Sequence, residues 1–289
     1  MYVELEDRYD CIETGVEMNM DIQHQQMAYQ ISQIEHRYSK KVRILSNPYL
    51  MSLLNDLSRP NTYQPQINYL IEQLYRNLCI DVVNNFFPRE IVSTDTRMKQ
   101  FGPHGVFTGE LIAKSTRVIT VDLARAGTFP SHVCFDIFNN LLTPANIRQD
   151  HIYINRKVNA KEEVVGVDFS GSKVGGDKEA AIVVFPDPMG ATGGTISYAI
   201  NHYKNKIEGQ EIRFIAMHLV ITPEYIQKIT SDHPDLEVVA IRLDRGLSAE
   251  KILKSIPGSY PAEERGLNSK QYIVPGLGGV GEILNNSFV

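Results

Sequence analysis

Between Arg117 and Leu243 the sequence alternates short β-rich runs with stretches of helical spacing, and this alternation restricts the possible folds more than any other feature. The β-rich runs are RVITVDL, HIYI, VVGVDF, AAIVVF, RFIAMHLVI and EVVAI, and the helix-like stretches include HVCFDIFNNLL and TISYAINHYKNK. A strand, a helix and a further strand in succession favour parallel pairing, because the crossover between parallel strands is usually a helix. We therefore predict an α/β fold, with a mostly parallel sheet and helices on both faces.

Apolar spacing also predicts helices before this region. From Gln66 to Phe87 apolar residues recur at steps of three and four, and Pro88 marks the expected end of that helix. The first 45 residues are polar, but four apolar side chains follow one helical stripe: Met27, Ile31, Ile34 and Tyr38. We expect an N-terminal helical arm over residues 1–45, packed on the body or on a second subunit, and one domain over residues 46–289.

Composition and charge exclude several classes of protein. A chain of 289 residues with 43% hydrophobic residues can fill a sizeable core. No apolar run approaches the ~18 residues of a membrane span. The opening MYVELEDRYD has acids where a signal peptide has lysines, so we expect a cytoplasmic protein with no membrane partner. A net charge of −5 without a run of Lys and Arg argues against a nucleic-acid partner.

Neither the cysteines nor the histidines have the spacing of a metal site. Cys11, Cys79 and Cys134 are odd in number and far apart, with no CxxC motif, so we expect buried reduced thiols. The eight histidines include no HExxH motif, and no pair of carboxylates suggests a protein metal site. We therefore assign no metal ligand to the chain.

The stretch VVFPDPMGATGGTISYAI joins the end of a strand to a turn of small residues and the start of a helix. Backbone N–H groups of such a turn meet at one spot, where the helix dipole also favours an anion. Thr192 and Thr195 can add hydroxyl donors, and Asp187 can accept hydrogen bonds from the hydroxyls of a sugar. The turn therefore predicts a sugar-phosphate site beyond the carboxyl end of a strand, the place where parallel sheets bind ligands.

Other interpretations of the glycines have less support. A P-loop needs Lys before its final Ser or Thr, and Gly193-Gly194-Thr195 offers none. A plain strand-to-helix turn also uses glycine for tightness, but the aspartate and the two threonines favour a binding site. Further on, GLGGVG matches G-x-G-x-x-G, but the eight residues after Gly281 are too few for the helix and second strand of a dinucleotide site.

Three segments together resemble the uracil phosphoribosyltransferases. The family's loop for phosphoribosyl pyrophosphate, which characteristically begins with Asp-Pro-Met, is similar to Asp187-Pro188-Met189-Gly190-Ala191-Thr192-Gly193-Gly194-Thr195. Its pyrophosphate loop resembles Arg125-Ala126-Gly127, and its uracil-binding segment resembles YIVPGLG, residues 272–278. The order and spacing also agree. The likeness runs from about Asn47 to about Asn286, outside the arm and an inserted loop at about 248–266.

The resemblance implies a type I phosphoribosyltransferase fold and a transferase of pyrimidine salvage. Such an enzyme joins uracil to phosphoribosyl pyrophosphate and releases UMP and pyrophosphate. The resemblance implies Mg²⁺ carried by phosphoribosyl pyrophosphate, and a homodimer or higher homo-oligomer. The reaction passes through an oxocarbenium-like state while negative charge grows on the leaving group, so catalysis is mostly positioning and electrostatics.

The resemblance also assigns the site residues, with Arg125 and Asp187 expected to be catalytic. The residues expected to bind phosphoribosyl pyrophosphate are Arg125, Ala126, Gly127, Arg156, Asp187, Pro188, Met189, Gly190, Ala191, Thr192, Gly193, Gly194 and Thr195. Those expected to bind uracil are Tyr272, Ile273, Gly278, Gly279 and Val280. Arg156 matches a second family arginine at the start of a flap, but the letters around it differ, and an ordinary solvated charge is the alternative. Lys173 has less support in the same region.

One position departs from the family pattern. After Gly-Leu-Gly the family has an aspartate beside the ribose and the base, and this chain has Gly279. Glu282 is three residues further, about 10 Å along an extended loop, so we do not expect it to replace the missing group. Two functions stay open: a transferase acting on uracil or a close pyrimidine-like base, and a non-catalytic protein that senses UMP or phosphoribosyl pyrophosphate. An RNA-binding regulator on the same fold has less support, because the chain is acidic.

Overall fold

The computed structural model describes residues 21–158 and 164–287. The chain divides into two units, residues 1–28 with 89–112 and residues 29–88 with 113–289. The larger unit thus includes residues 29–45 as well as most of the domain expected from residue 46 onward. All residues of the candidate site described below lie in this larger unit.

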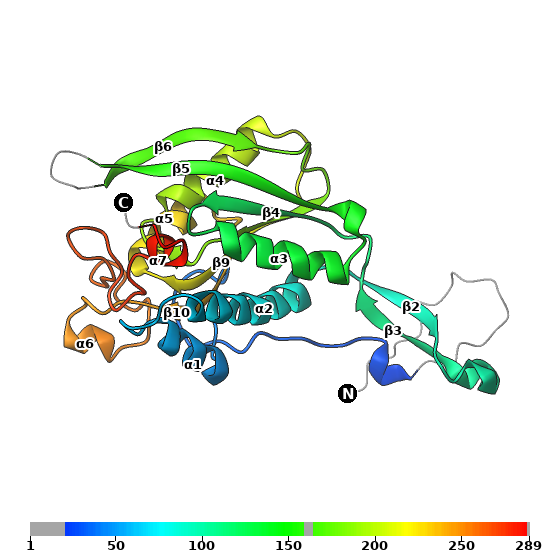
Figure 1. The fold of residues 1–289 in the computed structure, drawn as a ribbon. Coiled ribbons are helices and arrows are strands. Elements are labelled where there is room, and N and C mark those ends of the chain that lie inside the picture. Colours follow the sequence, from blue (N-terminus) through cyan, green and yellow to red (C-terminus); the bar gives the residue numbers. More distant parts are fainter. Residues whose placement is uncertain (1–20, 159–163, 288–289) are drawn as a thin grey trace. The chain divides into compact units, whose positions relative to one another are not determined.

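One eight-stranded sheet forms the centre of the larger unit, in the order β1, β10, β9, β7, β4, β5 and β6, with β8 paired to β9. Figure 1 shows β4, β5 and β6 side by side in this sheet. The strand bounds are β1 Val42–Ile44, β4 Arg117–Ala124, β5 Ile147–Val158, β6 Val164–Lys173, β7 Ala181–Pro186, β8 Met189–Gly190, β9 Arg213–Ile221 and β10 Glu237–Leu243. The neighbouring strands are parallel except for β5 and β6. All six β-rich runs lie in these strands, which confirms the predicted α/β fold.

Helices cover both faces of this sheet. On one face lie α1, α2 and α3, and on the other lie α4 and α5 (Figure 1). The bounds are α1 Pro48–Leu57, α2 Gln66–Phe86, α3 Thr128–Leu141, α4 Gly194–Lys206 and α5 Pro223–Asp232. The helices predicted from apolar spacing at residues 66–87, in HVCFDIFNNLL and in TISYAINHYKNK are therefore confirmed. The remaining short helices of this unit are η3 Pro144–Asn146, α6 Glu250–Leu253 and α7 Val280–Leu284.

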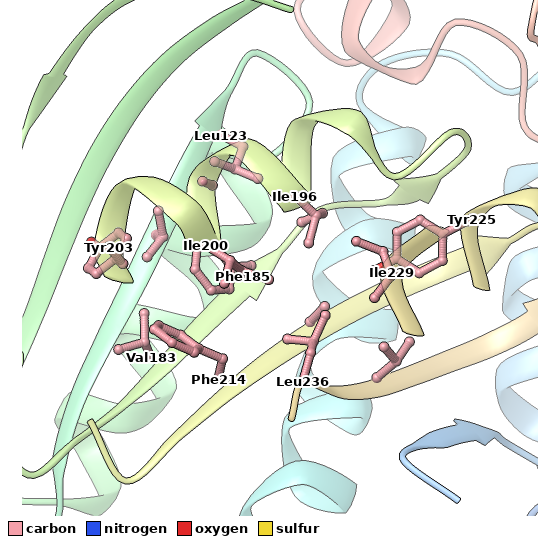
Figure 2. Close-up of a cluster of buried hydrophobic side chains, with 14 of the residues drawn as sticks. Leu123, Val183, Phe185, Ile196, Ile200, Tyr203, Phe214, Tyr225, Ile229 and Leu236 are labelled. Carbon is pink, nitrogen blue, oxygen red and sulfur yellow. The ribbon is translucent and has the colours of Figure 1, made fainter. Parts of the chain in front are cut away.

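A buried apolar cluster joins α4 and α5 to the sheet (Figure 2). Val183 and Phe185, which alternate along β7, both have their side chains in this cluster. The ring of Phe185 meets Tyr203 of α4 edge to face, with the ring centroids 5.8 Å apart. Such pairing adds to the stabilisation from burial. The cluster fixes the start of α4 relative to the end of β7, and the loop between them is the predicted phosphate site.

The predicted helical arm is wrong where the structure describes it. After the short 3-10 helix η1 (Ile22–His24) no helix follows before α1. The backbone instead pairs with the segment at β1, since Ile34 N–H donates to Ile44 (3.0 Å). Ile31 is buried and Tyr38 packs on the core, whereas Met27 is exposed. The apolar steps of three and four therefore come from an extended segment that buries only some of its side chains. Residues 1–20 of the arm lie outside the described residues.

The smaller unit contains an antiparallel pair that the sequence patterns did not indicate. Strand β2 (Arg89–Asp95) pairs with β3 (Val106–Ile112), and η2 (Lys99–Gly105) lies between them. A cross-strand hydrogen bond joins the hydroxyls of Ser93 and Thr108 (2.8 Å). Most side chains of β2 are exposed, so the pair lacks the one-sided apolar alternation by which strands are recognised.

The expected inserted loop at about 248–266 contains α6 and several turns. Its fold depends on Glu264, which is fully buried. This carboxylate accepts hydrogen bonds from Arg245 (3.0 Å), from the backbone N–H of Gly258 (2.8 Å) and from the hydroxyl of Tyr38. Several charge-assisted bonds of this kind compensate for the burial of a carboxylate.

The described cysteines agree with the prediction of buried reduced thiols. Cys79 and Cys134 are free and buried, with their sulfurs 3.4 Å apart, and burial raises the pKa of the Cys134 thiol well above its usual range. Cys11 lies outside the described residues. Among the described helices, none is long and apolar enough to cross a membrane.

Candidate functional site

A pocket lies beyond the carboxyl ends of β4 and β7, which are neighbouring parallel strands. Two segments contribute most of its lining: residues 124–127 at the end of β4, and residues 187–195 after β7, which we call the phosphate loop. Nine predicted residues line it: Arg125, Ala126, Asp187, Met189, Gly190, Ala191, Thr192, Gly193 and Thr195. Gly127, Pro188 and Gly194 belong to the same loops without lining the pocket. The structure therefore brings together two segments that are sixty residues apart.

Hydrogen bonds to its carbonyl groups attach the phosphate loop to the sheet. Four of them accept hydrogen bonds from β9 and the turn after it: those of Asp187, Pro188, Gly190 and Ala191. The donors include the ring Nδ1 of His218 (2.6 Å), the backbone N–H of Leu219 (3.0 Å), and Thr222 through both its N–H (3.1 Å) and its hydroxyl (2.6 Å). Because these peptide oxygens are engaged with the sheet, the orientation of the loop's peptide planes is fixed.

The backbone N–H groups of the loop form its other side. In the part of the chain that the structure describes, those of Thr192, Gly193 and Thr195 donate to no protein acceptor. Gly193 has φ of 78° directly before α4 begins at Gly194, a conformation that favours glycine. Open N–H groups at a helix N-terminus, with two threonine hydroxyls beside them, attract an anion.

Two glycines of these loops are required by close packing. A β-carbon on Gly190 would lie 2.8 Å from Cγ2 of Ile221 and 3.1 Å from the ring of Tyr225. A β-carbon on Gly127 would lie 2.8 Å from the carbonyl oxygen of Leu123. Each contact is shorter than carbon atoms normally allow, so larger residues would displace the loops. The glycines thus let the backbone approach both the core and the pocket.

The side chain of Asp187 is half-buried at the start of the phosphate loop. One carboxylate oxygen accepts a hydrogen bond from the backbone N–H of Met189 (3.3 Å), which holds the side chain at the turn. A carboxylate has about four acceptor positions, so one side chain can accept from the backbone and from the hydroxyls of a ligand at the same time.

Arg125, in the loop after β4, is an exposed charge in the lining of the pocket. Its guanidinium donates to the hydroxyl (3.0 Å) and to the carbonyl (3.3 Å) of Ser287. Among the described residues no carboxylate lies within ion-pair distance of it. The peptide bond from Ala124 to Arg125 is cis. A guanidinium without an acidic partner makes this side of the pocket positive and can bind an anion through two oxygens.

The other two basic candidates lie on the β5–β6 hairpin. Arg156 is opposite Val167 in the strand register, and the structure describes only the backbone of this residue. Its predicted contact with pyrophosphate therefore stays a prediction. Lys173 is exposed at the end of β6, opposite His151. Ile154, which lines the pocket, lies three residues beyond His151 along β5.

The predicted uracil segment lies next to the loop after β4, outside the lining of the pocket. A β-carbon on Gly281 would be 3.5 Å from Ala126, which places the start of α7 against that loop. The carboxylate of Asp244 anchors the segment by accepting from the backbone N–H of Gly276 (2.8 Å), and Arg242 donates to the Gly276 carbonyl (3.2 Å). Within this segment Ile273 and Val280 are buried and Tyr272 and Gly278 are exposed.

The geometry at Gly279 corrects the estimate for Glu282. Residues 279–282 form the first turn of α7, where the backbone N–H of Glu282 donates to the Gly279 carbonyl (3.0 Å). A β-carbon on Gly279 would lie 2.6 Å from Oε2 of Glu282. The distance of about 10 Å assumed an extended loop, and a helical turn shortens it. The carboxylate of Glu282 thus occupies the space that a side chain at position 279 would fill.

Five lining residues were not identified from the sequence: Leu123, Ala124, Ile154, Ile196 and Tyr225. The first two directly precede Arg125, and Ile196 follows the phosphate loop, so their neighbours in sequence could have indicated them. Tyr225 comes from α5 and matches no motif. Within the described residues, no three His, Cys, Asp or Glu side chains are grouped as metal ligands would be.

The sequence also matches a known protein family. The family model described as uracil phosphoribosyltransferase matches residues 44–259. The chain is 28% identical over 226 residues to the uracil phosphoribosyltransferase of Salinibacter ruber, covering 78% of this chain and 96% of that one. It is 28% identical over 243 residues to that of Pyrobaculum islandicum, covering 83% and 97%.

A solved structure shares the fold. The AQ2163 protein from Aquifex aeolicus superimposes with a TM-score of 0.63 at 22% identity, covering 84% of this chain and 97% of that one. The match of the family model extends over most of the sequence, including both pocket loops, and the curated relatives are covered almost completely. The chain belongs to the uracil phosphoribosyltransferase family.

Proposed function

We propose that this protein transfers the phosphoribosyl group of phosphoribosyl pyrophosphate to uracil, giving UMP and pyrophosphate. The observation that carries the proposal is one pocket with two anion sites. The open N–H groups belong to the phosphate loop after β7, and Arg125, without an acidic partner among the described residues, belongs to the loop after β4. A sugar that carries a phosphate at one end and pyrophosphate at the other matches this arrangement.

In this proposal each end of the substrate has its own ligands. The 5′-phosphate accepts hydrogen bonds from the N–H groups and hydroxyls of Thr192 and Thr195, at the N-terminus of α4. The ribose hydroxyls donate to Asp187. The guanidinium of Arg125 and the N–H groups at Ala126 bind the pyrophosphate. Mg²⁺ bound to phosphoribosyl pyrophosphate would neutralise part of the charge of its phosphates.

The chemical step is a substitution at C1 of the ribose. The bond from C1 to the pyrophosphate oxygen breaks, and that oxygen keeps the electron pair. The bond from C1 to N1 of uracil forms, and the N1 proton leaves to solvent or to a base. Negative charge grows on the leaving group in the transition state, so Arg125 stabilises that state more than the ground state.

We place uracil beside the segment of residues 273–280. Backbone N–H and carbonyl groups of a loop can pair with the edge of a flat base and so select it without a charged side chain. Glu282 supplies the carboxylate on this side, because its oxygen fills the space beside Gly279. A carboxylate there favours the positive charge that develops on the ribose.

The test is the formation of UMP from uracil and phosphoribosyl pyrophosphate with Mg²⁺, with cytosine, orotate and hypoxanthine as alternative bases. We expect UMP with uracil and less than about a hundredth of that rate with hypoxanthine, because a purine does not fit the same edge pairing. Turnover with another base and none with uracil would contradict the choice of base. Binding of phosphoribosyl pyrophosphate without turnover of any base would identify a ligand-sensing protein instead.

A further inference from the structure

We propose that His218 and Tyr225 are positioning residues that together set the shape of the phosphate loop. Neither belongs to the motifs of the sequence, and the inference depends on the proposed function only for the identity of the ligand. His218 lies on β9 and Tyr225 on α5, and both side chains are completely buried behind the loop.

The two side chains form a continuous hydrogen-bonded chain to the loop. Nδ1 of His218 is 2.6 Å from the carbonyl oxygen of Asp187, and Nε2 is 2.6 Å from the hydroxyl oxygen of Tyr225. The rings meet edge to face, with centroids 4.7 Å apart and planes at 76°. Both bonds are short, and both ring nitrogens of the histidine are used.

The partners determine where the protons are. A peptide carbonyl only accepts, so Nδ1 carries the hydrogen, and Nε2 of the neutral ring accepts from the hydroxyl of Tyr225. Burial lowers the pKa of His218 to about 4, so the ring is neutral near pH 7. Burial also raises the pKa of the Tyr225 hydroxyl well above its usual range, which keeps its proton in place. The chain of donors therefore runs in one direction, from Tyr225 through His218 to Asp187.

This chain acts on both ends of the phosphate loop. At the first end it fixes the peptide of Asp187, whose side chain faces the ribose in the proposed function. At the other end the ring of Tyr225 forms the wall against which Gly190 and Gly193 pack. Their β-carbons would lie 3.1 Å and 3.5 Å from that ring. The imidazole thus holds the phenol ring in place while it holds the start of the loop.

Simple filling of the core does not account for this arrangement. A buried histidine costs free energy unless both ring nitrogens are paired, and an aliphatic side chain would fill the space without that cost. The histidine is the group that can donate to the Asp187 carbonyl and accept from a phenol at the same time. Groups that bind a transition state must be held within a fraction of an ångström, which is the function we infer here.

Four variants test the inference. His218→Leu removes both bonds, and His218→Asn keeps a donor near the place of Nδ1. Tyr225→Phe removes the hydroxyl and keeps the ring. The matched control is Tyr203→Phe, because Tyr203 is an equally buried tyrosine of the same core whose hydroxyl donates to Asp150 (2.6 Å), away from the loop.

The measurements are the KM for phosphoribosyl pyrophosphate, the KM for uracil, the UMP affinity by calorimetry, and Tm. We expect His218→Leu to raise the KM for phosphoribosyl pyrophosphate and weaken UMP by ~10- to 100-fold. Tyr225→Phe should raise the KM for phosphoribosyl pyrophosphate and weaken UMP binding by ~5- to 10-fold each. His218→Asn should recover most of the affinity that His218→Leu loses. The KM for uracil should change less than about twofold. Tyr203→Phe should lower Tm with both KM values unchanged.

The inference is overturned if Tyr225→Phe and, where it folds, His218→Leu bind UMP as tightly as the wild type does. It is also overturned if Tyr203→Phe weakens UMP binding as much as Tyr225→Phe does. A wild type that forms no UMP from uracil would reject the proposed function alone. In that case the affinities of the four variants for UMP and for phosphoribosyl pyrophosphate still decide whether His218 and Tyr225 position the loop.

Discussion

The phosphate loop and the C-terminal segment at residues 273–282 are supported in different ways. Four carbonyl groups of the phosphate loop are bonded to β9 and the turn after it, in the middle of the sheet. The C-terminal segment lies outside the sheet. It is held by the side chains of Arg242 and Asp244, by backbone hydrogen bonds of Val274 with Gly246 (3.0 Å) and Gly266 (2.8 Å), and by one turn of a five-residue helix. The sheet thus defines the anion site rigidly, and the base site is built from a peripheral segment whose residues are freer to change.

This difference predicts where substitutions are most costly. Substitutions of polar and charged residues in the anion site, which the sheet supports, should have large effects on the binding or reaction of one part of the substrate. Residues of the C-terminal segment should have smaller effects, which a neighbouring side chain can compensate. The four predictions below test this contrast, from the largest expected effect to the smallest.

Arg125→Ala should lower kcat/KM for phosphoribosyl pyrophosphate by ~100- to 1,000-fold, because it removes the charge beside the leaving group. The affinity for UMP should change less than about threefold, since UMP has no pyrophosphate. Steady-state kinetics and calorimetry measure the two quantities. Arg125→Lys keeps the charge without the bidentate geometry, so its kcat/KM for phosphoribosyl pyrophosphate should lie between those of the wild type and Arg125→Ala. Equal losses for both ligands would reject the assignment of Arg125 to pyrophosphate.

Asp187→Ala and Thr192→Ala should each weaken UMP and phosphoribosyl pyrophosphate alike, by ~1.5 to 3 kcal/mol, or ~10- to 150-fold. Each removes a hydrogen-bond partner of the sugar phosphate that both ligands share. Calorimetry with both ligands measures the effect. Thr192→Ser, which keeps the hydroxyl, is the control. Unchanged affinity in both alanine variants would mean that the loop has a purely structural role.

The sequence was sufficient to predict this rigid side. Strand β7 is a continuous apolar run, β4 and β9 are rich in β-branched and apolar residues, and the strand–glycine–helix order of residues 187–195 is local in sequence. This motif and Arg125-Ala126 together contain nine of the fourteen residues that line the pocket. His218 and Tyr225 could not be found in this way, because their function depends on contacts between β9, α5 and the loop that no local pattern records.

Two errors have the same physical origin. The stripe from Met27 to Tyr38 has helical steps, but the chain there is extended and pairs at β1, because tertiary hydrogen bonds outweigh a weak periodicity. The distance from Gly279 to Glu282 was estimated for an extended loop, and the structure has a helical turn. In both places short segments without strong propensity take the conformation that their neighbours impose.

Glu282→Gln is the third prediction, and it tests the peripheral side. Removal of the negative charge beside the ribose should lower kcat by about 10-fold, with the affinity for phosphoribosyl pyrophosphate nearly unchanged. Single-turnover formation of UMP separates this effect from product release. Glu282→Asp retracts the carboxylate by one methylene and should lose about as much. A Glu282→Gln variant with wild-type kcat would show that this carboxylate has no part in the reaction.

The last prediction concerns Gly279 and is the smallest in the wild-type background. Gly279 has φ of −81°, so aspartate at this position meets no backbone penalty. Its side chain would instead meet the carboxylate of Glu282, whose oxygen lies 2.6 Å from the new β-carbon. Gly279→Asp alone should therefore change kcat less than about threefold, since one carboxylate displaces another and like charges repel.

In the Glu282→Gln background the same substitution, Gly279→Asp, should raise kcat about fivefold and so restore part of the lost rate. Gly279→Asn in that background has nearly the same size without the charge and should restore nothing. A double-mutant cycle of kcat values measures this coupling. Additive effects would mean that positions 279 and 282 do not share one function, and the contrast between the two sides of the site would then rest on the first two predictions.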